Sequence, residues 1–383
     1  MPNFDFHSTR SIVMERGASA TLARRVHDLG ARSVLIVTDA GVLGAGLLDK
    51  VLPPFEQVGI AVTLFSDVEA DPPESVILAA VAVAASANVD FVVGFGGGSS
   101  MDVAKLVALL AVGQEQMAGI YGVGKARGPR LPLVLVPTTA GTGSEVTPIS
   151  IVTTGVGEKK GVVSPVLLPD VALLDAELTL GLPAHVTAAT GIDAMVHAIE
   201  AYTSKRLKNP VSDCLAREAL RLLSQNIHSA TWDGSDGQAR ENMLLGACLA
   251  GMAFANAPVA GVHALAYPLG ARFHLPHGLS NSLMLAPVIR FCLDAALPLY
   301  AEIAQIVVPQ FSGTERQRAS ALADYLASLA GELGLPQRLS EVGIAAADVP
   351  QLAEDAMLQT RLLVNSPREI RLEDAAALYA EAL

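Results

Sequence analysis

Apolar, β-branched runs alternate with helix-like segments along the first 180 residues of the chain. The strand-like runs are apolar on both faces, which is typical of a parallel sheet covered by helices on both sides. The pattern predicts strands at residues 33–38, 60–65, 89–95 and 131–136, and helices at 43–58 and 73–88. A hairpin of residues 149–153 and 160–164 is expected around the turn at 154–157.

The pattern changes near residue 180, beyond which no convincing strand appears. Long stretches rich in Ala and Leu predict helices at 184–205, 210–228, 238–254, 279–293, 314–333 and 349–363. The length of 383 residues fits two domains. We therefore expect an α/β domain at 1–180 and an all-helical domain at 181–383, packed closely with a ligand cleft between them.

Four ionisable side chains of the helical half form the sharpest chemical signal. Asp193 and His197 stand four residues apart and share one face of a helix. His263 and His277 follow in a second segment, where Pro276-His277-Gly278 is expected to break the helix and fix the last imidazole. One carboxylate and three imidazoles suit a divalent transition metal with open positions, and this ligand set fits both Fe²⁺ and Zn²⁺.

Two glycine-rich loops indicate a nucleotide cofactor. Residues 94–105 read Gly-Phe-Gly-Gly-Gly-Ser-Ser-Met-Asp-Val-Ala-Lys, between a predicted strand and a predicted helix. Glycines let the backbone approach a phosphate, and the helix start supplies N–H groups and a positive dipole end. A tight strand-to-helix turn is the alternative, but the context favours pyrophosphate binding. Residues 137–147, dense in Thr, Ser and Gly, suit ribose or phosphate oxygens.

Asp39 lies at the end of the first predicted strand. A carboxylate there can accept hydrogen bonds from the adenosine ribose and repel a 2′-phosphate. It can also simply cap the following helix. We interpret Asp39 as a ribose ligand and expect NAD rather than NADP.

Composition excludes several classes of partner. The net charge of −12 argues against nucleic acid and anionic membranes. The apolar run 244–262 approaches the length of a membrane span, but it is built from Ala and Gly and contains Pro258, so a buried core helix is expected. No secretory signal opens the chain, which predicts a cytoplasmic protein. The three cysteines form no CxxC and are expected to be buried thiols: Cys214, Cys248 and Cys292.

Taken together, these motifs resemble the iron-containing (group III) alcohol dehydrogenase family. The match is strong in residues 96–105, 137–147 and 193–281, and it extends over essentially the whole chain. The resemblance implies a Rossmann-like domain followed by an all-helical domain, the dehydroquinate synthase-like layout, and a homodimer or larger oligomer. It implies that Asp193, His197, His263 and His277 bind the metal. The residues that it implies for NAD contact are Asp39, Gly97, Gly98, Ser99, Thr138, Thr139, Thr147, Lys160 and Leu178.

This chain departs from the family pattern at three positions. Many relatives have His at the place of Tyr267, near the metal and the nicotinamide, where it is implicated in proton relay. A phenol can also donate a proton, but its ordinary pKa of about 10 makes it a poorer base. Tyr at this place is similar to the hydroxyacid–oxoacid transhydrogenase branch. Ser100 replaces a common Pro, and Asp71 replaces a common Asn near the adenosine.

The resulting hypothesis is reversible oxidation of a small alcohol to an aldehyde or ketone by NAD. The metal would act as a Lewis acid on the alcohol oxygen, and hydride would pass to the nicotinamide. Tyr267 and His274, which is expected to line the cleft, are the catalytic candidates. The alternatives are a glycerol or diol dehydrogenase, a hydroxyacid–oxoacid transhydrogenase, a metal-independent reductase, a dehydroquinate-synthase-like lyase, and an NAD-binding sensor without turnover.

Overall fold

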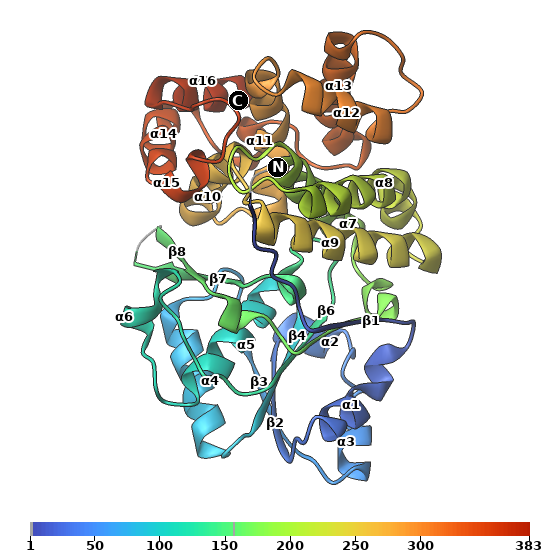
Figure 1. The fold of residues 1–383 in the computed structure, drawn as a ribbon, viewed down its shortest axis with the longest axis vertical. Helices are drawn as coiled ribbons and strands as arrows, with labels where there is room; N and C mark the ends of the chain where they lie inside the picture. Colours follow the sequence, from blue (N-terminus) through green and yellow to red (C-terminus); the bar gives the residue numbers. More distant parts are fainter. Residues whose placement is uncertain (1–2, 156–157) are drawn as a thin grey trace. The chain divides into compact units, whose positions relative to one another are not determined.

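The computed structural model describes residues 3–155 and 158–383 (Figure 1). The chain divides into two compact units. One is His7–Gly181, and the other is Leu182–Leu383 together with the N-terminal segment up to Phe6. Each unit is considered by itself.

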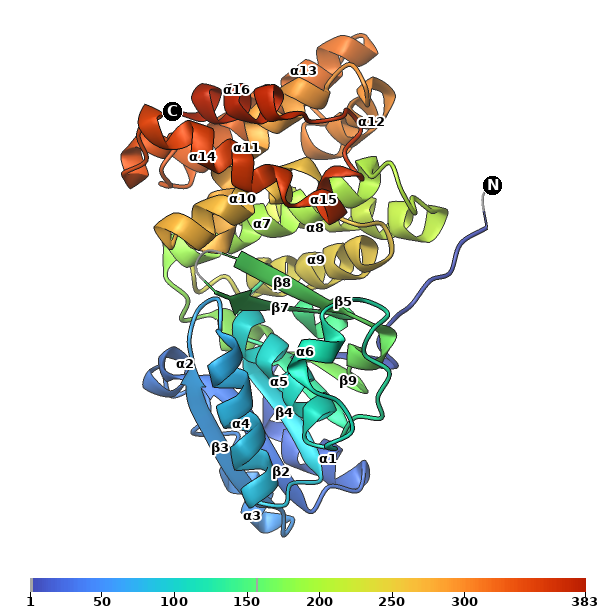
Figure 2. The ribbon, with the colours of Figure 1, turned by 90° about the vertical axis from the view of Figure 1, so that its left-hand side faces the viewer.

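The first unit is built on a six-stranded parallel sheet with the order β1-β9-β6-β4-β2-β3 (Figures 1 and 2). Its strands are β1 Ser11–Met14, β2 Ser33–Asp39, β3 Ala61–Val68, β4 Phe91–Gly96, β6 Leu133–Pro137 and β9 Val171–Leu174. The parallel sheet expected from the sequence is confirmed. Four of its strands were predicted, whereas β1 and β9 were not, because each has only four residues.

Helices cover both faces of this sheet, as the doubly apolar strands require. One face packs against α1 (Leu22–Asp28) and α3 (Pro53–Gln57), in a core that includes Leu22, Phe55 and Phe91. The other face packs against α4 (Glu74–Ser86) and α5 (Gly98–Leu110), in a core that includes Ile77 and Met101. Figure 1 shows the two pairs of helices on opposite sides of the strands.

The helix predicted at residues 43–58 is wrong. The structure has two short helices here, α2 (Ala40–Gly44) and α3, separated by turns. Gly46 adopts a φ of 67°, which ends helical geometry, and the Pro53-Pro54 pair restarts it because proline suits the first turn of a helix.

The predicted hairpin is confirmed. Strand β7 (Ile149–Thr154) pairs antiparallel with β8 (Glu158–Val163), and the two-residue strand β5 (Gly122–Val123) joins β8. Residues 156–157 of the predicted turn lie outside the described residues. A four-residue helix, α6 (Met117–Ile120), precedes β5.

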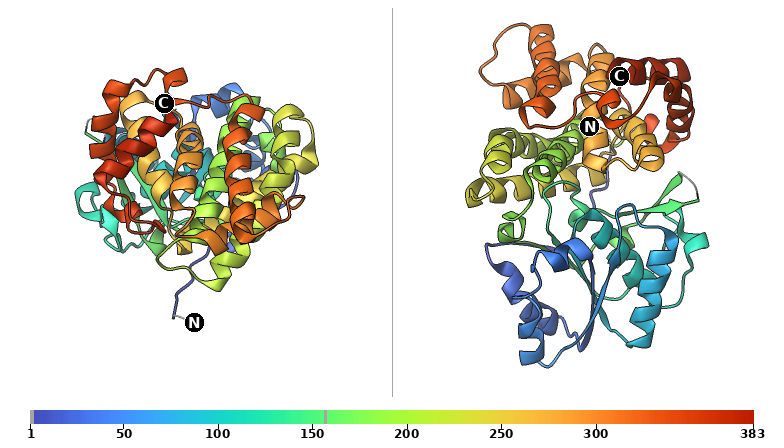
Figure 3. Two further views of the ribbon diagram at one scale, coloured as in Figure 1. Left: turned by 90° about the horizontal axis from the view of Figure 1, so that it is seen from above. Right: turned by 180° about the vertical axis from the view of Figure 1, so that it is seen from behind.

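The second unit contains only helices and loops among its described residues, as expected (Figure 3). Its helices are α7 Ala184–Thr203, α8 Pro210–Trp232, α9 Gly237–Asn256, α10 Gly261–Phe273, α11 His277–Cys292, α12 Leu297–Val307, α13 Glu315–Glu332, α14 Val349–Met357, α15 Thr360–Leu363 and α16 Leu372–Ala382. The Ala- and Leu-rich stretches located most of them. The segment 349–363 was predicted as one helix but is two, and α10, α12 and α16 were not predicted.

The apolar run at 244–262 is buried, as expected, but it is not one helix. It covers the end of α9, a break at residues 257–260 and the start of α10, and the two helices meet at 106°. Within the described part of the chain, no single helix is long and apolar enough to cross a membrane, although this bent pair passes that test jointly by length and composition.

Two local expectations in the helical unit need correction. Cys248 and Cys292 are buried free thiols, but Cys214 is exposed because it lies on the outer face of α8. Pro276-His277-Gly278 does not break a helix; it begins α11, with Pro276 as the N-cap. A Cβ at Gly278 would lie 2.4 Å from the carbonyl oxygen of Ala189, so glycine lets α11 begin directly against α7.

Candidate metal centre and nucleotide hollow

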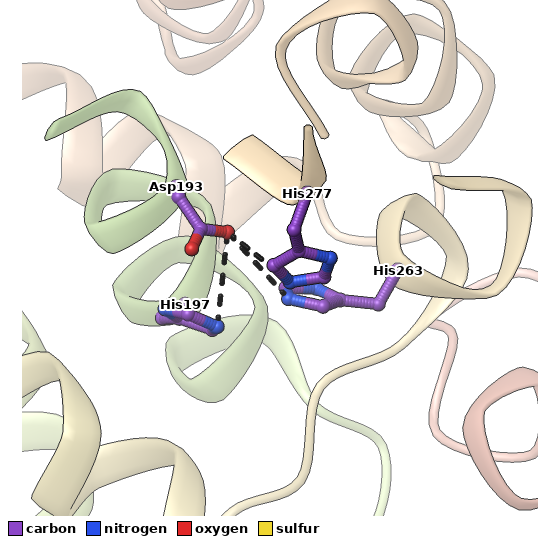
Figure 4. Close-up of side chains that lie close together, drawn as sticks. All are labelled: Asp193, His197, His263 and His277. Atoms are coloured by element: carbon purple, nitrogen blue, oxygen red, sulfur yellow. Dashed lines mark ion pairs between the residues drawn. The ribbon is translucent and has the colours of Figure 1, made fainter. Parts of the chain in front are cut away.

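Three helices of the second unit bring four metal-binding side chains together (Figure 4). Helix α7 carries Asp193 and His197 one turn apart, while His263 comes from α10 and His277 is the first residue of α11. Each side chain offers one ligand atom, and these atoms all lie within 4.8 Å of one another. The sequence predicted this set of four.

The carboxylate of Asp193 faces all three imidazoles. Its Oδ1 atom lies 3.6 Å from Nε2 of His277 and 3.9 Å from Nε2 of both His197 and His263. Metal–ligand bonds to N and O are about 2.0–2.2 Å long, so two atoms on one metal can be up to about 4.4 Å apart. The three distances fall within that span.

The cluster is buried except at His277, which forms its open side. Asp193, His197 and His263 are buried, whereas the side chain of His277 is 30% exposed. The His197 ring stacks on the rings of Phe254 and His263, with ring centres 4.3 Å and 4.7 Å apart, respectively. The stacking contacts hold the His197 and His263 rings in place, and the partly exposed side chain of His277 leaves the cluster accessible to a small molecule.

The electrostatics of the cluster favour a charged carboxylate at Asp193 and a neutral ring at His263. Burial raises the pKa of Asp193, but the nearby His197, His277 and His263 and a hydrogen bond from Asn281 outweigh it, so the pKa lies below its ordinary value. Burial, together with the neighbouring His197 and His277, lowers the pKa of His263 well below its ordinary value. A carboxylate with neutral imidazoles is the state that binds a divalent cation.

Glu200 supports His263 from behind. Its Oε2 atom lies 2.6 Å from Nδ1 of His263 and accepts a hydrogen bond from the backbone of Ala260, while Oε1 accepts one from Val262. Burial raises the pKa of Glu200 to about 7 against the effect of these donors. The carboxylate thus fixes both the ring and the α9–α10 connection. It lies three residues after His197, and this helical spacing could have revealed it in the sequence.

Asn281 is a second supporting residue that the sequence reasoning missed. It lies one turn after His277, and its Nδ2 atom donates to Asp193 Oδ1 over 2.6 Å and lies 3.2 Å from Nε2 of both His263 and His277. The buried Oδ1 atom of Asn281 has no hydrogen-bond partner among the described residues. Three ring nitrogens and a carboxylate around one point, held in place by the Asn281 amide, fit a divalent metal.

The two catalytic candidates lie differently. Tyr267 is on α10 one turn after His263, with its ring centre 5.9 Å from that of His277 and 6.4 Å from that of His263. It therefore stands on the open side of the cluster. His274 ends α10 in a left-handed conformation, with a φ of 54°, and is exposed.

A separate hollow of about 330 Å³ lies in the α/β unit. It is formed where β2, β3 and β4 end and α5 begins, and its lining is Asp39–Gly41, Val68–Ala70 and Gly97–Ser100. Strand β2 lies between β3 and β4, so the chain order reverses here, and ligands of open α/β sheets bind at such switch points. The thirteen-residue α5 directs its N-terminal N–H groups there.

Asp39 both caps a helix and lines this hollow. Its Oδ1 atom accepts from the backbone of Val42, as the N-cap of α2, and Oδ2 accepts from the Ser100 hydroxyl, each over 3.0 Å. The two roles considered for Asp39, helix cap and ribose ligand, are therefore compatible, because each carboxylate oxygen keeps an unused lone pair. A Cβ at Gly97 would meet nothing nearer than 3.8 Å, so this edge is open for a phosphate and fits a dinucleotide.

A buried lysine ties the hydroxyl-rich loop to α5. Lys105 Nζ donates to Ser144 Oγ over 2.7 Å, to Thr147 Oγ1 over 3.1 Å and to the carbonyl of Ile149 over 2.7 Å, and it pairs with Asp102 at 3.4 Å. Asp102 also accepts from Ser144 and from the backbone of Ile151. Burial lowers the pKa of Lys105, while Asp102 acts in the opposite direction. This network was not predicted from the sequence.

The other residues predicted to contact the cofactor differ in how far they are buried. Thr138 and Thr147 are buried, Thr139 is half-buried near Gly97, and Lys160 on β8 is exposed with its Nζ 5.9 Å from the Tyr121 ring. Leu178 is packed into the core beneath β2 and β6.

Asp71, noted as a departure from the family pattern, forms an ion pair with Lys159. The distance is 2.6 Å, and the Lys159 side chain is only 5% exposed. The Asp71 backbone, at a φ of 52°, accepts from the hydroxyl of Thr153. This links the end of β3 to the β7–β8 hairpin.

Comparison with known proteins identifies the family. Residues 9–176 match the family described as iron-containing alcohol dehydrogenase, and residues 187–383 match the Fe-containing alcohol dehydrogenase family, C-terminal. Long-chain-alcohol dehydrogenase 1 of Geobacillus thermodenitrificans is 41% identical over 370 residues, which cover 96% of this chain and 93% of that protein.

Solved structures agree with this match. A 1,3-propanediol oxidoreductase is similar with a TM-score of 0.96 and 35% identity over 100% of both chains. A sulfoacetaldehyde reductase from Bifidobacterium kashiwanohense, solved in complex with NAD⁺, has a TM-score of 0.88 and 28% identity over 100% of this chain and 99% of that one. With these likenesses and the clustered Asp and His side chains, the chain belongs to the iron-containing alcohol dehydrogenase family, and it is an NAD-dependent alcohol oxidoreductase with a metal site.

Proposed function

We propose that the protein interconverts a small alcohol and its aldehyde or ketone at a divalent metal held by Asp193, His197, His263 and His277. The observation that carries the proposal is the convergence of these four ligand atoms within 4.8 Å on three helices. A divalent metal bound there supplies Lewis acidity, and NAD accepts or returns the hydride. Fe²⁺ and Zn²⁺ both suit the ligand set.

The residues around the ligands orient the substrate and exclude water. Phe254, stacked on His197, makes the buried side of the cluster apolar. The exposed edge of His277 is where an alcohol enters, and Tyr267 flanks that edge. A largely buried, apolar site favours hydride transfer because it excludes water from the reacting groups.

Tyr267 is the proposed proton donor and acceptor for the substrate oxygen. Its place on the open side of the cluster, one turn after His263, supports this role. His274, at the exposed end of α10, is proposed to assist from the rim. The resemblance noted above implies His at the position of Tyr267 in many relatives, and we propose that proton transfer is the step in which this chain differs from them.

The nucleotide is proposed to bind in the α/β hollow. The N-terminus of α5 would face the pyrophosphate, and Asp39 would accept hydrogen bonds from the adenosine ribose. The full set of proposed contacts is Asp39, Gly97, Gly98, Ser99, Thr138, Thr139, Thr147, Lys160 and Leu178. The boundary between a dinucleotide-binding domain (1–180) and a metal- and substrate-binding domain (181–383) follows from the same assignment.

The substrate is best sought among small alcohols and diols. A similar structure is that of a 1,3-propanediol oxidoreductase, which favours a diol as the second candidate beside simple primary alcohols. Because Tyr267 is similar to the residue of the hydroxyacid–oxoacid transhydrogenase branch, that activity is the third candidate.

A single screen separates these candidates. The protein would be stripped of metal with a chelator and reloaded with Fe²⁺ or Zn²⁺. Reduction of NAD⁺ would then be measured with a panel of alcohols, diols and hydroxyacids. Turnover with free NAD⁺ and an alcohol or diol supports the proposal. Oxidation of a hydroxyacid only when an oxoacid is present indicates a transhydrogenase instead. Full activity of the chelated protein contradicts a metal-dependent reaction.

We also propose that the protein works in the cytoplasm as a homodimer or larger homo-oligomer, on small molecules rather than on nucleic acid or membranes. The net charge of −12 and the family support this. Light scattering coupled to gel filtration tests the oligomer, and a mass of one 39.7 kDa chain contradicts it.

A further inference from the structure

We propose that Glu69 is a second specificity-determining carboxylate beside Asp39, and that the two together select NAD over NADP. This inference rests on the proposed binding of a dinucleotide in the α/β hollow. Asp39 was identified from the sequence, whereas Glu69 was not, because its position becomes meaningful only when β3 is paired with β2.

The pairing of the two strands brings the carboxylates to one rim. Strands β2 and β3 are parallel neighbours, and Asp39, the last residue of β2, stands opposite Val68, the last residue of β3. Glu69 is the next residue and lines the same hollow. Both acidic side chains therefore lie at the carboxyl ends of adjacent strands, where the adenosine ribose of a dinucleotide is held.

The charge of the hollow is one-sided. Among its ten lining residues, Asp39 and Glu69 are the ionisable ones, and none is Lys, Arg or His. The N–H groups at the start of α5 offer positive potential, but a dinucleotide uses them for its pyrophosphate. A 2′-phosphate on the ribose would thus meet two carboxylates and no cation among the residues that line the hollow; the nearby Lys159 is already paired with Asp71.

The two carboxylates differ in how firmly they are held. Each oxygen of Asp39 has a hydrogen bond, from Val42 and from Ser100, so this group is fixed at the ribose. Glu69 is exposed and has no hydrogen bond or ion pair among the described residues. Its longer side chain can turn toward a ribose hydroxyl or a 2′-phosphate, and its charge acts over a distance even when it makes no contact.

This difference predicts that the contributions of Asp39 and Glu69 to the preference for NAD over NADP can be measured separately. Neutralising Asp39 alone leaves a negative charge at the rim, so discrimination against NADP persists. Because Glu69 is exposed, its effect is screened by salt, whereas the hydrogen bonds of Asp39 to the ribose are not. A single negative charge near a doubly charged phosphate changes affinity by about tenfold at low salt.

The test is isothermal titration of the metal-loaded protein with NAD⁺ and NADP⁺ at low and high salt. The variants are Glu69→Gln, Asp39→Asn and the double substitution. Asn at position 39 keeps the cap of α2 while removing the charge. Glu56→Gln is the matched control, since Glu56 is an exposed carboxylate of the same unit, on α3, and does not line the hollow.

Glu69→Gln should lower the ratio of the NADP⁺ to the NAD⁺ dissociation constant about tenfold at low salt and clearly less at 0.5 M salt. The double variant should lower it further than Asp39→Asn alone, and Glu56→Gln should leave it within about twofold. A ratio in Glu69→Gln that equals that of the control overturns the inference. Absence of NAD⁺ binding to the unsubstituted protein would instead overturn the proposed function, so the two failures are distinguishable.

Discussion

The Oε2 atom of Glu200 lies 2.6 Å from Nδ1 of His263, while Nε2 of the same ring lies 3.9 Å from Oδ1 of Asp193. The carboxylate accepts a hydrogen bond from Nδ1–H, and the Nε2 lone pair is then free to face the cluster. Carboxylate–histidine pairs of this kind orient metal ligands and raise their basicity. The metal centre of this chain thus depends on a residue that would never touch the metal.

Replacement of Glu200 by Gln should weaken metal binding by about 10- to 100-fold, because Gln keeps the volume but loses the negative charge behind His263. Titration of the chelated variant with Zn²⁺ and Fe²⁺ measures this directly. Glu218→Gln on the surface of α8 makes the same chemical change away from the cluster and should bind metal normally. Equal affinities for Glu200→Gln and the unsubstituted protein would contradict the role of Glu200.

Tyr267→Phe should retain the metal and lower kcat by about 10²-fold or more, since a positioned acid–base group contributes about 10²- to 10⁴-fold. Tyr267→His should restore part of the activity and shift the pH dependence of kcat toward neutral values, because an imidazole titrates near pH 6.5. Steady-state kinetics with metal analysis of each variant checks both. An unchanged kcat in Tyr267→Phe would remove Tyr267 from the reaction.

Lys105→Met should destabilise the α/β unit by about 3–5 kcal/mol, because it removes the cationic partner of Asp102 and the hydrogen-bond donor to the hydroxyls of Ser144 and Thr147. The affinity for NAD⁺ should fall as well, since the hydroxyl-rich loop loses its anchor to α5. Urea unfolding and isothermal titration measure the two effects. A loss of stability below about 1 kcal/mol would show that the lysine is dispensable.

Glu145 makes the stability of the same unit depend on pH. Burial raises the pKa of Glu145 from 4.5 to about 7, against the attraction of Lys105. Between these values the folded chain holds a proton that the unfolded chain releases. The contribution of Glu145 to stability is therefore fully present below pH 4.5 and is lost as the pH rises through 7.

Glu145→Gln should gain stability over the unsubstituted protein as the pH rises from 4.5 to 7, by at most about 3 kcal/mol. Thermal unfolding across this pH range measures the difference, with the exposed Glu56→Gln as the control that should show none. A difference that is constant with pH would contradict the assignment.

The sequence predicted the parts of the fold that show in the alternation and composition of its segments. The apolar runs 33–38 and 89–95, which alternate with helix-like segments, indicated a covered parallel sheet, and the long Ala- and Leu-rich stretches indicated helices. It did not reveal β1, which is too short to show a period and forms only because β9 pairs with it. The break between α9 and α10 was hidden by an uninterrupted apolar composition.

For the candidate site, the sequence identified the chemistry but not its support. Asp193 and His197 were recognisable from their four-residue spacing on one helix, and the structure brings His263 and His277 beside them. The spacing of Glu200 from His197 was a signal that the sequence analysis did not use, whereas Asn281 gains its role only when the three helices are packed together. Glu69 likewise gains a meaning only from the register of β2 and β3.

The most direct test of the metal centre is the metal content of His263→Ala, measured by mass spectrometry after purification and reloading, together with NAD⁺ reduction by an alcohol substrate. His185→Ala, an exposed histidine at the start of the same α7 that carries Asp193 and His197, is the matched control. The account predicts that His263→Ala loses both the metal and turnover while the control keeps both. A fully active His263→Ala variant without metal would contradict it.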